Sequence, residues 1–207
     1  VIRSEGVLAE AVDATEVVVT NTQYQSAAPL LEPTRLKLRE RLLPMLQAGK
    51  VPVVTGYVGA TEGGVPTTLG RGGSDYSASI VADALEASEV RNFSDVDGVL
   101  TTDPRVAPDA HTIKILSATE MSEMAFFGAQ VLHPLTILPL VEKRIPLRVK
   151  NTFNPTHPGT LIVYDNAPAD QPIKSVSVIR EVAVVTVTGR GMMGVAGIAA
   201  RTFTAVA

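Results

Sequence analysis

The run Val51-Pro52-Val53-Val54-Thr55-Gly56 decides the fold class, because a helical pattern stands directly before it. Residues 33–47 place leucines on one stripe at helical spacing, namely Leu38, Leu42 and Leu46. We expect Pro44 to bend this helix and Gly49 to end it in the left-handed conformation. A buried β-branched strand that follows such a helix is typical of a parallel sheet covered by helices.

The same alternation continues on both sides of this unit. A strand is expected at residues 16–20, and a turn at residues 61–64 leads into a Gly-rich loop. A helix is expected at residues 75–89, with an apolar face made of Ala78, Val81, Ala84 and Leu85. The later expected elements are strands at residues 90–94, 147–152 and 160–164, a helix from the Ser117 capping box to Leu132, and a helix that begins at Pro134.

The composition changes at residues 165–172, which hold two prolines and no bulky apolar residue and are expected to form a linker. Two strand-like runs at 173–179 and 182–188 follow, and then an amphipathic helix at 194–207. The chain starts with Val rather than Met, and its last helix stops without a cap, so we expect both ends to be cut.

Composition excludes several classes of protein. The 207 residues include 18 Lys+Arg and 21 Asp+Glu, a net charge of −3 that does not favour nucleic acid as a partner, and 4% aromatics make a base-stacking surface improbable. No apolar run approaches the roughly 18 residues of a membrane span. The absence of cysteine excludes disulfides, thiolate zinc sites and a cysteine nucleophile. A cytoplasmic globular protein is expected.

The strongest motif is the loop Leu69-Gly70-Arg71-Gly72-Gly73-Ser74-Asp75 before an expected helix. Its glycines let backbone N–H groups approach an anion, and the helix N-terminus adds the positive end of its dipole. Arg71 is suited to bind a carboxylate or phosphate through two hydrogen bonds, and Asp75 to cap the helix or orient a catalytic group. An ordinary loop with an N-cap is the alternative. No Gly-Lys-Ser/Thr follows, so this is not a Walker P-loop.

A second motif spans residues 93–105 and contains Asp95-Val96-Asp97-Gly98. It follows the carboxyl end of an expected strand, where open α/β sheets bind ligands. Gly98 comes too early for an EF-hand, and no Glu closes the loop. A turn-rich connection without a ligand is the alternative.

A third pattern, Gly189-Arg190-Gly191-Met192-Met193-Gly194, matches the G-x-G-x-x-G of dinucleotide-binding proteins. The acidic residue that completes this fingerprint would stand about 20 positions further on, beyond the last residue, so NAD binding is only a weak alternative. His111, His133 and His157 show no metal-ligand spacing, and His133 before Pro134 is interpreted as a structural residue.

Taken together and in this order, the motifs resemble those of the aspartate kinases in the amino-acid kinase family. The matching segments are residues 51–56, 67–78, 94–98, 102–105, 127–134, 150–152 and 158–161. The resemblance implies that residues 1–164 form part of an amino-acid kinase catalytic domain, a three-layer αβα sandwich with a mainly parallel sheet. It also implies that residues 173–207, after the 165–172 linker, begin a ferredoxin-like ACT regulatory domain, as in bifunctional aspartokinase–homoserine dehydrogenases.

The resemblance further implies transfer of the γ-phosphoryl group of ATP to the β-carboxylate of L-aspartate, with Mg²⁺ carried by the nucleotide. Asp75 would be the catalytic residue. The aspartate-binding residues would be Arg71, Gly72, Gly73 and Ser74, and the nucleotide-binding residues would be Ser94, Asp95, Leu100, Arg105, Gln130 and Val131. Homo-oligomers through the ACT regions are also implied.

The chain departs from the family pattern in three ways. Gln130 replaces a usual Lys, Leu100 replaces a frequent aromatic residue, and the Lys-Phe-Gly-Gly and Gly-Glu-Arg segments are absent. We therefore expect little kinase activity from this chain alone. The alternative function is an amino-acid-sensing regulatory module without catalysis.

Overall fold

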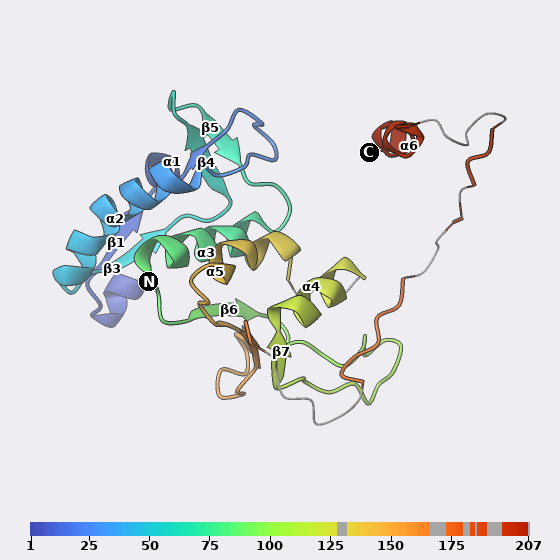
Figure 1. Cartoon of the computed structure of the whole chain (residues 1–207). Coiled ribbons are helices and arrows are strands. Elements are labelled where there is room, and N and C mark those ends of the chain that lie inside the picture. Colours follow the sequence, from blue (N-terminus) through green and yellow to red (C-terminus); the bar gives the residue numbers. More distant parts are fainter. Residues whose placement is uncertain (128–131, 166–172, 180–182, 185, 190–195, 207) are drawn as a thin grey trace.

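The structure is a computed structural model that describes residues 1–127, 132–165, 173–179, 183–184, 186–189 and 196–206. Figure 1 shows an α/β body in which helices lie against short strands, and the helix α6 (Ile198–Val206) standing apart from it. The linker expected at 165–172 and most of the G-x-G-x-x-G pattern lie outside the described residues. No described helix has the length and apolar character needed to cross a membrane.

The first half of the body contains two small sheets. One pairs β1 (Ala9–Val12) with β3 (Val51–Val54) in parallel. The other has the order β2-β4-β5, formed by β2 (Val19–Thr20), β4 (Val58–Thr61) and β5 (Pro66–Thr68). The helical elements of this half are η1 (Ile2–Glu5), α1 (Ala14–Val17), α2 (Leu31–Gln47) and α3 (Gly73–Leu85).

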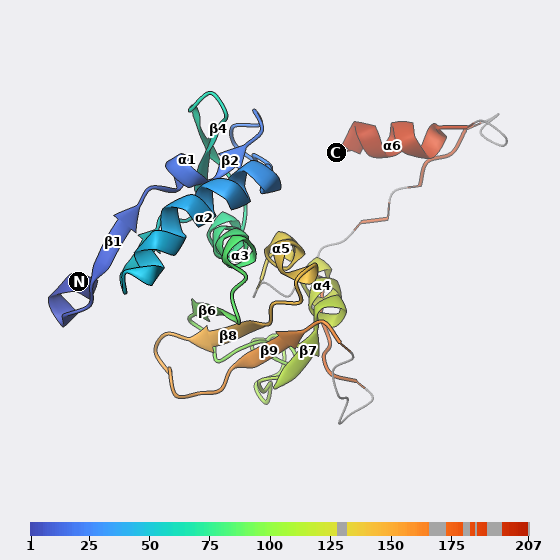
Figure 2. The same cartoon turned by 60° about the vertical axis from the view of Figure 1, so that its left-hand side comes forward.

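The second half contains a four-stranded sheet in the order β6-β8-β9-β7. Its strands are β6 (Val90–Ser94), β7 (Ile115–Ser117), β8 (Leu147–Asn151) and β9 (Thr160–Val163). Its helical elements are α4 (Ala118–Phe126), η2 (Pro134–Thr136) and α5 (Leu138–Val141). Figure 2 shows α3, α4 and α5 above one face of this sheet. Only the β4–β5 and β8–β9 pairs are antiparallel among the described strands, so the expected α/β class with a mainly parallel sheet is confirmed.

Helix α3 lies between two hydrophobic cores. Its Ile80 and Ala84 belong to the core under α2, whereas Ala82 belongs to the core above the β6-β8-β9-β7 sheet. The expected apolar face is therefore only partly right. Ala84 is buried, but Ala78 is exposed. The neighbours that cover α3 lie on two sides of it, and periodicity alone does not reveal which positions they bury.

Helix α2 confirms the predicted span and the glycine after its end, with one correction to its buried face. It spans the expected residues with Pro44 inside it, and Gly49 after its end has the positive φ of 70°. However, Met45 is buried and Leu46 is 44% exposed. The stripe that faces α3 and the first core therefore runs through Thr34, Leu38, Leu42 and Met45.

Several other strand predictions are corrected. Residues 14–17 form helix α1, capped by Asp13, so only Val19–Thr20 remains a strand in the expected 16–20 run. The run at Val51–Val54 is a strand but not a buried one, because β1 is its one partner among the described strands and leaves Val51 and Val53 exposed. Residues 173–179 form no strand, so the strand expected there is wrong, and the described residues of the 182–188 run form none either.

Local turn and cap predictions are confirmed. The 61–64 turn joins the antiparallel strands β4 and β5. Ser117 and Glu120 form the expected capping box, in which Glu120 N donates to Ser117 Oγ at 3.1 Å and Ser117 N donates to Glu120 Oε2 at 2.7 Å. The helix that follows ends at Phe126, and residues 128–131 of its expected continuation lie outside the described part.

Candidate active site

The Gly-rich motif forms a tight turn directly before α3. Gly70 and Gly72 have φ values of 76° and 72°, a left-handed conformation that glycine adopts without a steric penalty. A Cβ at Gly72 would lie 2.4 Å from His133 Cβ, so this turn approaches η2 closely enough that only glycine fits. His133 Nδ1 accepts a hydrogen bond from Leu135 N at 3.3 Å, which confirms its structural interpretation.

The polar side chains of this turn are available to a ligand. Arg71 and Ser74 are exposed, and Arg71 forms no ion pair with any residue that the structure describes. Gly72 is the N-cap residue of α3 and has no side chain. No N-cap side-chain oxygen therefore accepts a hydrogen bond from the first N–H groups of the helix. An anion placed here would meet a guanidinium, a hydroxyl and a helix N-terminus.

Asp75 connects this turn to the four-stranded sheet. It lies half-buried in the first turn of α3, which packs against β6, and the side chain of Asn92 on β6 acts to lower the pKa of its carboxyl. Burial raises the pKa of Asp75, while Asn92 and His133 partly oppose that shift. Sequence reasoning missed Asn92, although its position two residues before Ser94 on one strand places both side chains on the same face.

The second motif begins at the carboxyl end of β6, where expected. Ser94 is the last residue of that strand, faces Asn151 of the parallel strand β8, and donates from Oγ to Asp95 Oδ1 at 3.1 Å. Asp97 Oδ1 accepts hydrogen bonds from Asn151 Nδ2 at 2.9 Å and Asn154 Nδ2 at 3.1 Å. These two asparagines were also missed, although the place of Asn151 at the end of β8 and of Asn154 just after it was a usable signal.

The loop after Gly98 carries the other expected nucleotide contacts. Leu100 is half-buried and bridges Thr112 across the loop. Arg105 is exposed and forms a 2.7 Å ion pair with Asp103 of the same loop, so its guanidinium is held within this loop. Gln130 and Val131 lie outside the described residues.

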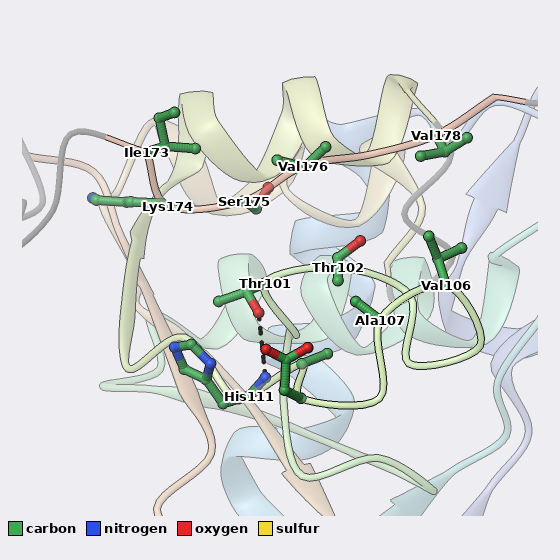
Figure 3. A pocket seen from close by; sticks show the side chains of 12 residues that line it. Thr101, Thr102, Val106, Ala107, His111, Ile173, Lys174, Ser175, Val176 and Val178 are labelled. Carbon is green, nitrogen blue, oxygen red and sulfur yellow. Dashed lines mark hydrogen bonds between the residues drawn. The ribbon is translucent and has the colours of Figure 1, made fainter.

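A cavity of about 440 Å³ lies between this loop and residues 173–178 (Figure 3). Val176 N donates to Thr101 O at 2.9 Å, and Lys174 Nζ lies 2.8 Å from Glu120 Oε1. The cavity contains none of the site residues expected from the sequence. The described residues also contain no cluster of three or more His, Cys, Asp or Glu that could hold a metal ion.

Comparisons with known proteins agree with this arrangement. A profile described as "Amino acid kinase family" matches residues 1–151. The chain is 38% identical over 211 residues to the bifunctional aspartokinase/homoserine dehydrogenase 2, chloroplastic, of Zea mays. It is 40% identical over 194 residues to aspartokinase 2, chloroplastic, of Arabidopsis thaliana. These alignments cover 99% and 93% of this chain but only 23% and 36% of the relatives.

Solved structures show the same likeness. The crystal structure of E. coli aspartokinase III in complex with aspartate and ADP (R-state) is 40% identical with a TM-score of 0.76, covering 80% of this chain and 37% of that one. The same enzyme in complex with lysine and aspartate (T-state) is 41% identical with a TM-score of 0.72, at the same coverage. The chain therefore spans little more than a third of these proteins.

Proposed function

Since the chain belongs to the amino acid kinase family, we propose that the protein it represents phosphorylates the β-carboxylate of L-aspartate with ATP, giving 4-phospho-L-aspartate. One observation carries the proposal. Helix α3, which begins in the Gly-rich turn and carries Asp75 in its first turn, contacts strand β6, at whose carboxyl end Ser94 and Asp95 lie. A turn suited to carboxylates and a strand end suited to a nucleotide are therefore carried by two elements in contact.

The turn supplies the aspartate side of the proposed site. Arg71 binds a substrate carboxylate through two parallel hydrogen bonds, and Gly72, Gly73 and Ser74 add backbone and hydroxyl donors. Phosphoryl transfer depends mainly on positioning and on neutralising charge, which is the chemistry these groups provide. Asp75 orients the reacting groups at the start of the helix.

The loop after β6 supplies the nucleotide side. Ser94 and Asp95 contact the adenosine portion, Leu100 packs beside it, and Arg105 leaves Asp103 to reach the phosphates. Gln130 and Val131 complete this part of the proposal. The exposed, oxygen-rich strand end fits a nucleotide that carries its own Mg²⁺, and the ion would supply charge neutralisation on the phosphates.

The proposal for the whole protein has further parts. They are a partial three-layer αβα catalytic domain over residues 1–164, the 165–172 linker, the start of an ACT region over residues 173–207, homo-oligomers through that region, a cytoplasmic location and little turnover by this chain alone. A second candidate is an amino-acid-sensing module without catalysis; its amino-acid binding, though not its lack of catalysis, has a parallel in the relative crystallised with lysine and aspartate.

Two measurements test the function. Calorimetry of the 207-residue chain is expected to show binding of ATP·Mg, and the whole protein is expected to form aspartyl hydroxamate when ATP, L-aspartate and hydroxylamine are supplied. Absence of hydroxamate from the folded whole protein would refute the kinase assignment. Lysine or threonine binding without ATP·Mg binding would favour the sensing module.

A further inference from the structure

The hydroxyl of Thr160 joins two distant parts of the chain. Thr160 is the first residue of β9 and is fully buried, with 0% of its surface exposed. Its Oγ1 donates to Ile113 O at 2.6 Å and accepts from Val99 N at 2.8 Å. The hydroxyl therefore uses its one donor and one of its acceptor positions on two backbone groups.

These two backbone groups are the ends of the loop that carries Leu100 and Arg105. Ile113 N also donates to Val99 O at 2.8 Å, which closes the loop at its base. The Thr160 hydroxyl lies beside this closure and satisfies the two remaining groups, Val99 N and Ile113 O. Both ends of the proposed nucleotide loop are thus fixed to one strand through one atom.

Gly98 shows how closely the loop approaches this hydroxyl. Its φ is 128°, and a Cβ there would lie 2.5 Å from Thr160 Oγ1 and 2.9 Å from Thr160 N. Only a glycine lets the backbone lie this close to the strand. Since Asp97 is held by Asn151 and Asn154, the segment from Asp97 to Val99 is anchored on the β8–β9 hairpin along its whole length.

We propose that Thr160 is a positioning residue for the nucleotide, acting through the loop of residues 99–113 without touching the ligand. The proposal rests on the assignment of that loop to ATP. Removing the hydroxyl leaves two buried backbone groups without this partner, which favours loop conformations that cannot bind. Apparent affinity then falls in proportion to the fraction of molecules in the binding conformation.

Matched substitutions separate this role from general packing. Thr160→Val keeps the shape of the side chain and removes its hydrogen bonds, whereas Thr160→Ser keeps the hydroxyl. Thr156→Val is the control, because Thr156 is an exposed threonine of the same hairpin connection that bonds only to Asn154 Oδ1 at 3.3 Å. Calorimetry with ATP·Mg is performed on each chain after circular dichroism has shown that it is folded.

We expect Thr160→Val to raise the Kd for ATP·Mg about tenfold, and Thr160→Ser and Thr156→Val to change it less than twofold. In the whole protein, Thr160→Val should raise the KM for ATP and leave the KM for aspartate unchanged, because the Arg71 turn makes none of these contacts. A general loss of packing would move both constants together. If Thr160→Val does not fold, Thr160→Cys, whose thiol is a weaker donor and acceptor, is measured with the same expectation.

The outcomes also distinguish the two proposals. Failure of the unsubstituted chain and of the whole protein to bind ATP·Mg would overturn the nucleotide assignment, and the role of Thr160 with it. Binding that is equally tight with and without the Thr160 hydroxyl would overturn the role of Thr160 alone.

Discussion

The guanidinium of Arg35 on α2 forms two hydrogen bonds with the buried carboxylate of Asp83 on α3. Nε lies 2.6 Å from Oδ2 and Nη2 lies 3.1 Å from Oδ1, and the Asp83 side chain is 1% exposed. The hydrogen bond to Asp83 is the main reason that the pKa of Arg35 is raised. Lys143 adds a 2.6 Å hydrogen bond to Asp83 O. This pair fixes the helix that carries Asp75 against its neighbour.

Breaking this pair should destabilise the fold strongly. Arg35→Met keeps most of the side-chain volume but leaves a buried carboxylate without its guanidinium, which should lower the free energy of unfolding by about 3–5 kcal/mol. Arg39→Met is the control, because the Arg39–Glu86 pair is exposed and should cost no more than about 1 kcal/mol. Urea denaturation of both variants checks the difference, and similar losses would contradict a special role for the buried pair.

Arg71 should be required for aspartate and not for the nucleotide. In the whole protein, Arg71→Ala should raise the KM for aspartate and reduce kcat/KM by an amount equivalent to about 2–4 kcal/mol, because a desolvated charge pair with the substrate is lost. Arg91→Ala is the control, since Arg91 is an exposed arginine paired with Glu89 on the sheet. Steady-state kinetics check this, and a loss confined to ATP would refute the assignment.

Asp75 should make stability depend on pH. Because its pKa is raised in the folded state, folding favours the protonated form, and stability is lost as the pH rises from the ordinary value of 3.8 through the folded pKa. Asp75→Asn should therefore be more stable than the unsubstituted protein at pH 7, with the difference shrinking below pH 3.8.

Thermal unfolding across pH 3 to 8 measures this difference, with Asp109→Asn as an exposed control. If Asp75 lies at the reacting centre as proposed, the same Asp75→Asn variant of the whole protein should lose activity by about 10²-fold or more, because an electrostatic group is removed there. If Asp75→Asn is less stable than the unsubstituted protein at neutral pH, the predicted direction of the pH dependence is wrong.

Tyr164 should tolerate the loss of its hydroxyl. The ring packs against the core of the second half, and its buried hydroxyl has no hydrogen-bond partner among the described residues. Burial raises the pKa of Tyr164 to about 12. Tyr164→Phe should increase the free energy of unfolding by about 1 kcal/mol, whereas Tyr24→Phe at an exposed site should have no effect. If Tyr164→Phe instead lowered the free energy of unfolding measured by urea denaturation, the hydroxyl would have a hydrogen-bond partner in solution.

Lys174 should hold residues 173–178 against the loop of residues 99–113, which they contact through the hydrogen bond from Val176 N to Thr101 O. Partial burial acts to raise the pKa of Glu120, but hydrogen bonds from Lys174 and Ser117 lower it overall. Lys174→Met should increase hydrogen exchange at Val176 N about fivefold, the effect of losing roughly 1 kcal/mol. Exposed Lys114→Met is the control. Unchanged exchange would show that the backbone bond to Thr101 alone holds the segment.

Features that depend on a few neighbouring residues could be predicted from the sequence. The capping box at Ser117, the glycine turn at Gly70 and Gly72, and the helix before Gly49 all formed where the local pattern placed them. Each depends on hydrogen bonds or φ preferences within one turn of chain. The prediction of a strand at 16–20 was wrong although its signal was also local. Asp13 caps a helix there by accepting a hydrogen bond from Thr15 N, and this signal was overlooked.

Features that depend on packing between distant elements could not be predicted in this way. Periodicity identified α2 as amphipathic, but the position of α3 decided that Met45 rather than Leu46 is buried. The carboxylate of Asp83 is buried inside α3 because Arg35 and Lys143 arrive from other elements to satisfy it.

The sequence by itself determined the α/β class, the glycine turn that carries Arg71, and the polar strand end at Ser94 and Asp95. The tertiary structure decided that α3, which carries Asp75, packs against β6 and that Thr160 holds the loop at Val99 and Ile113. The Thr160 partners stand 61 and 47 positions away along the chain. A hydroxyl carries no sequence signal of a partner so distant, because only folding brings the three atoms within hydrogen-bonding distance.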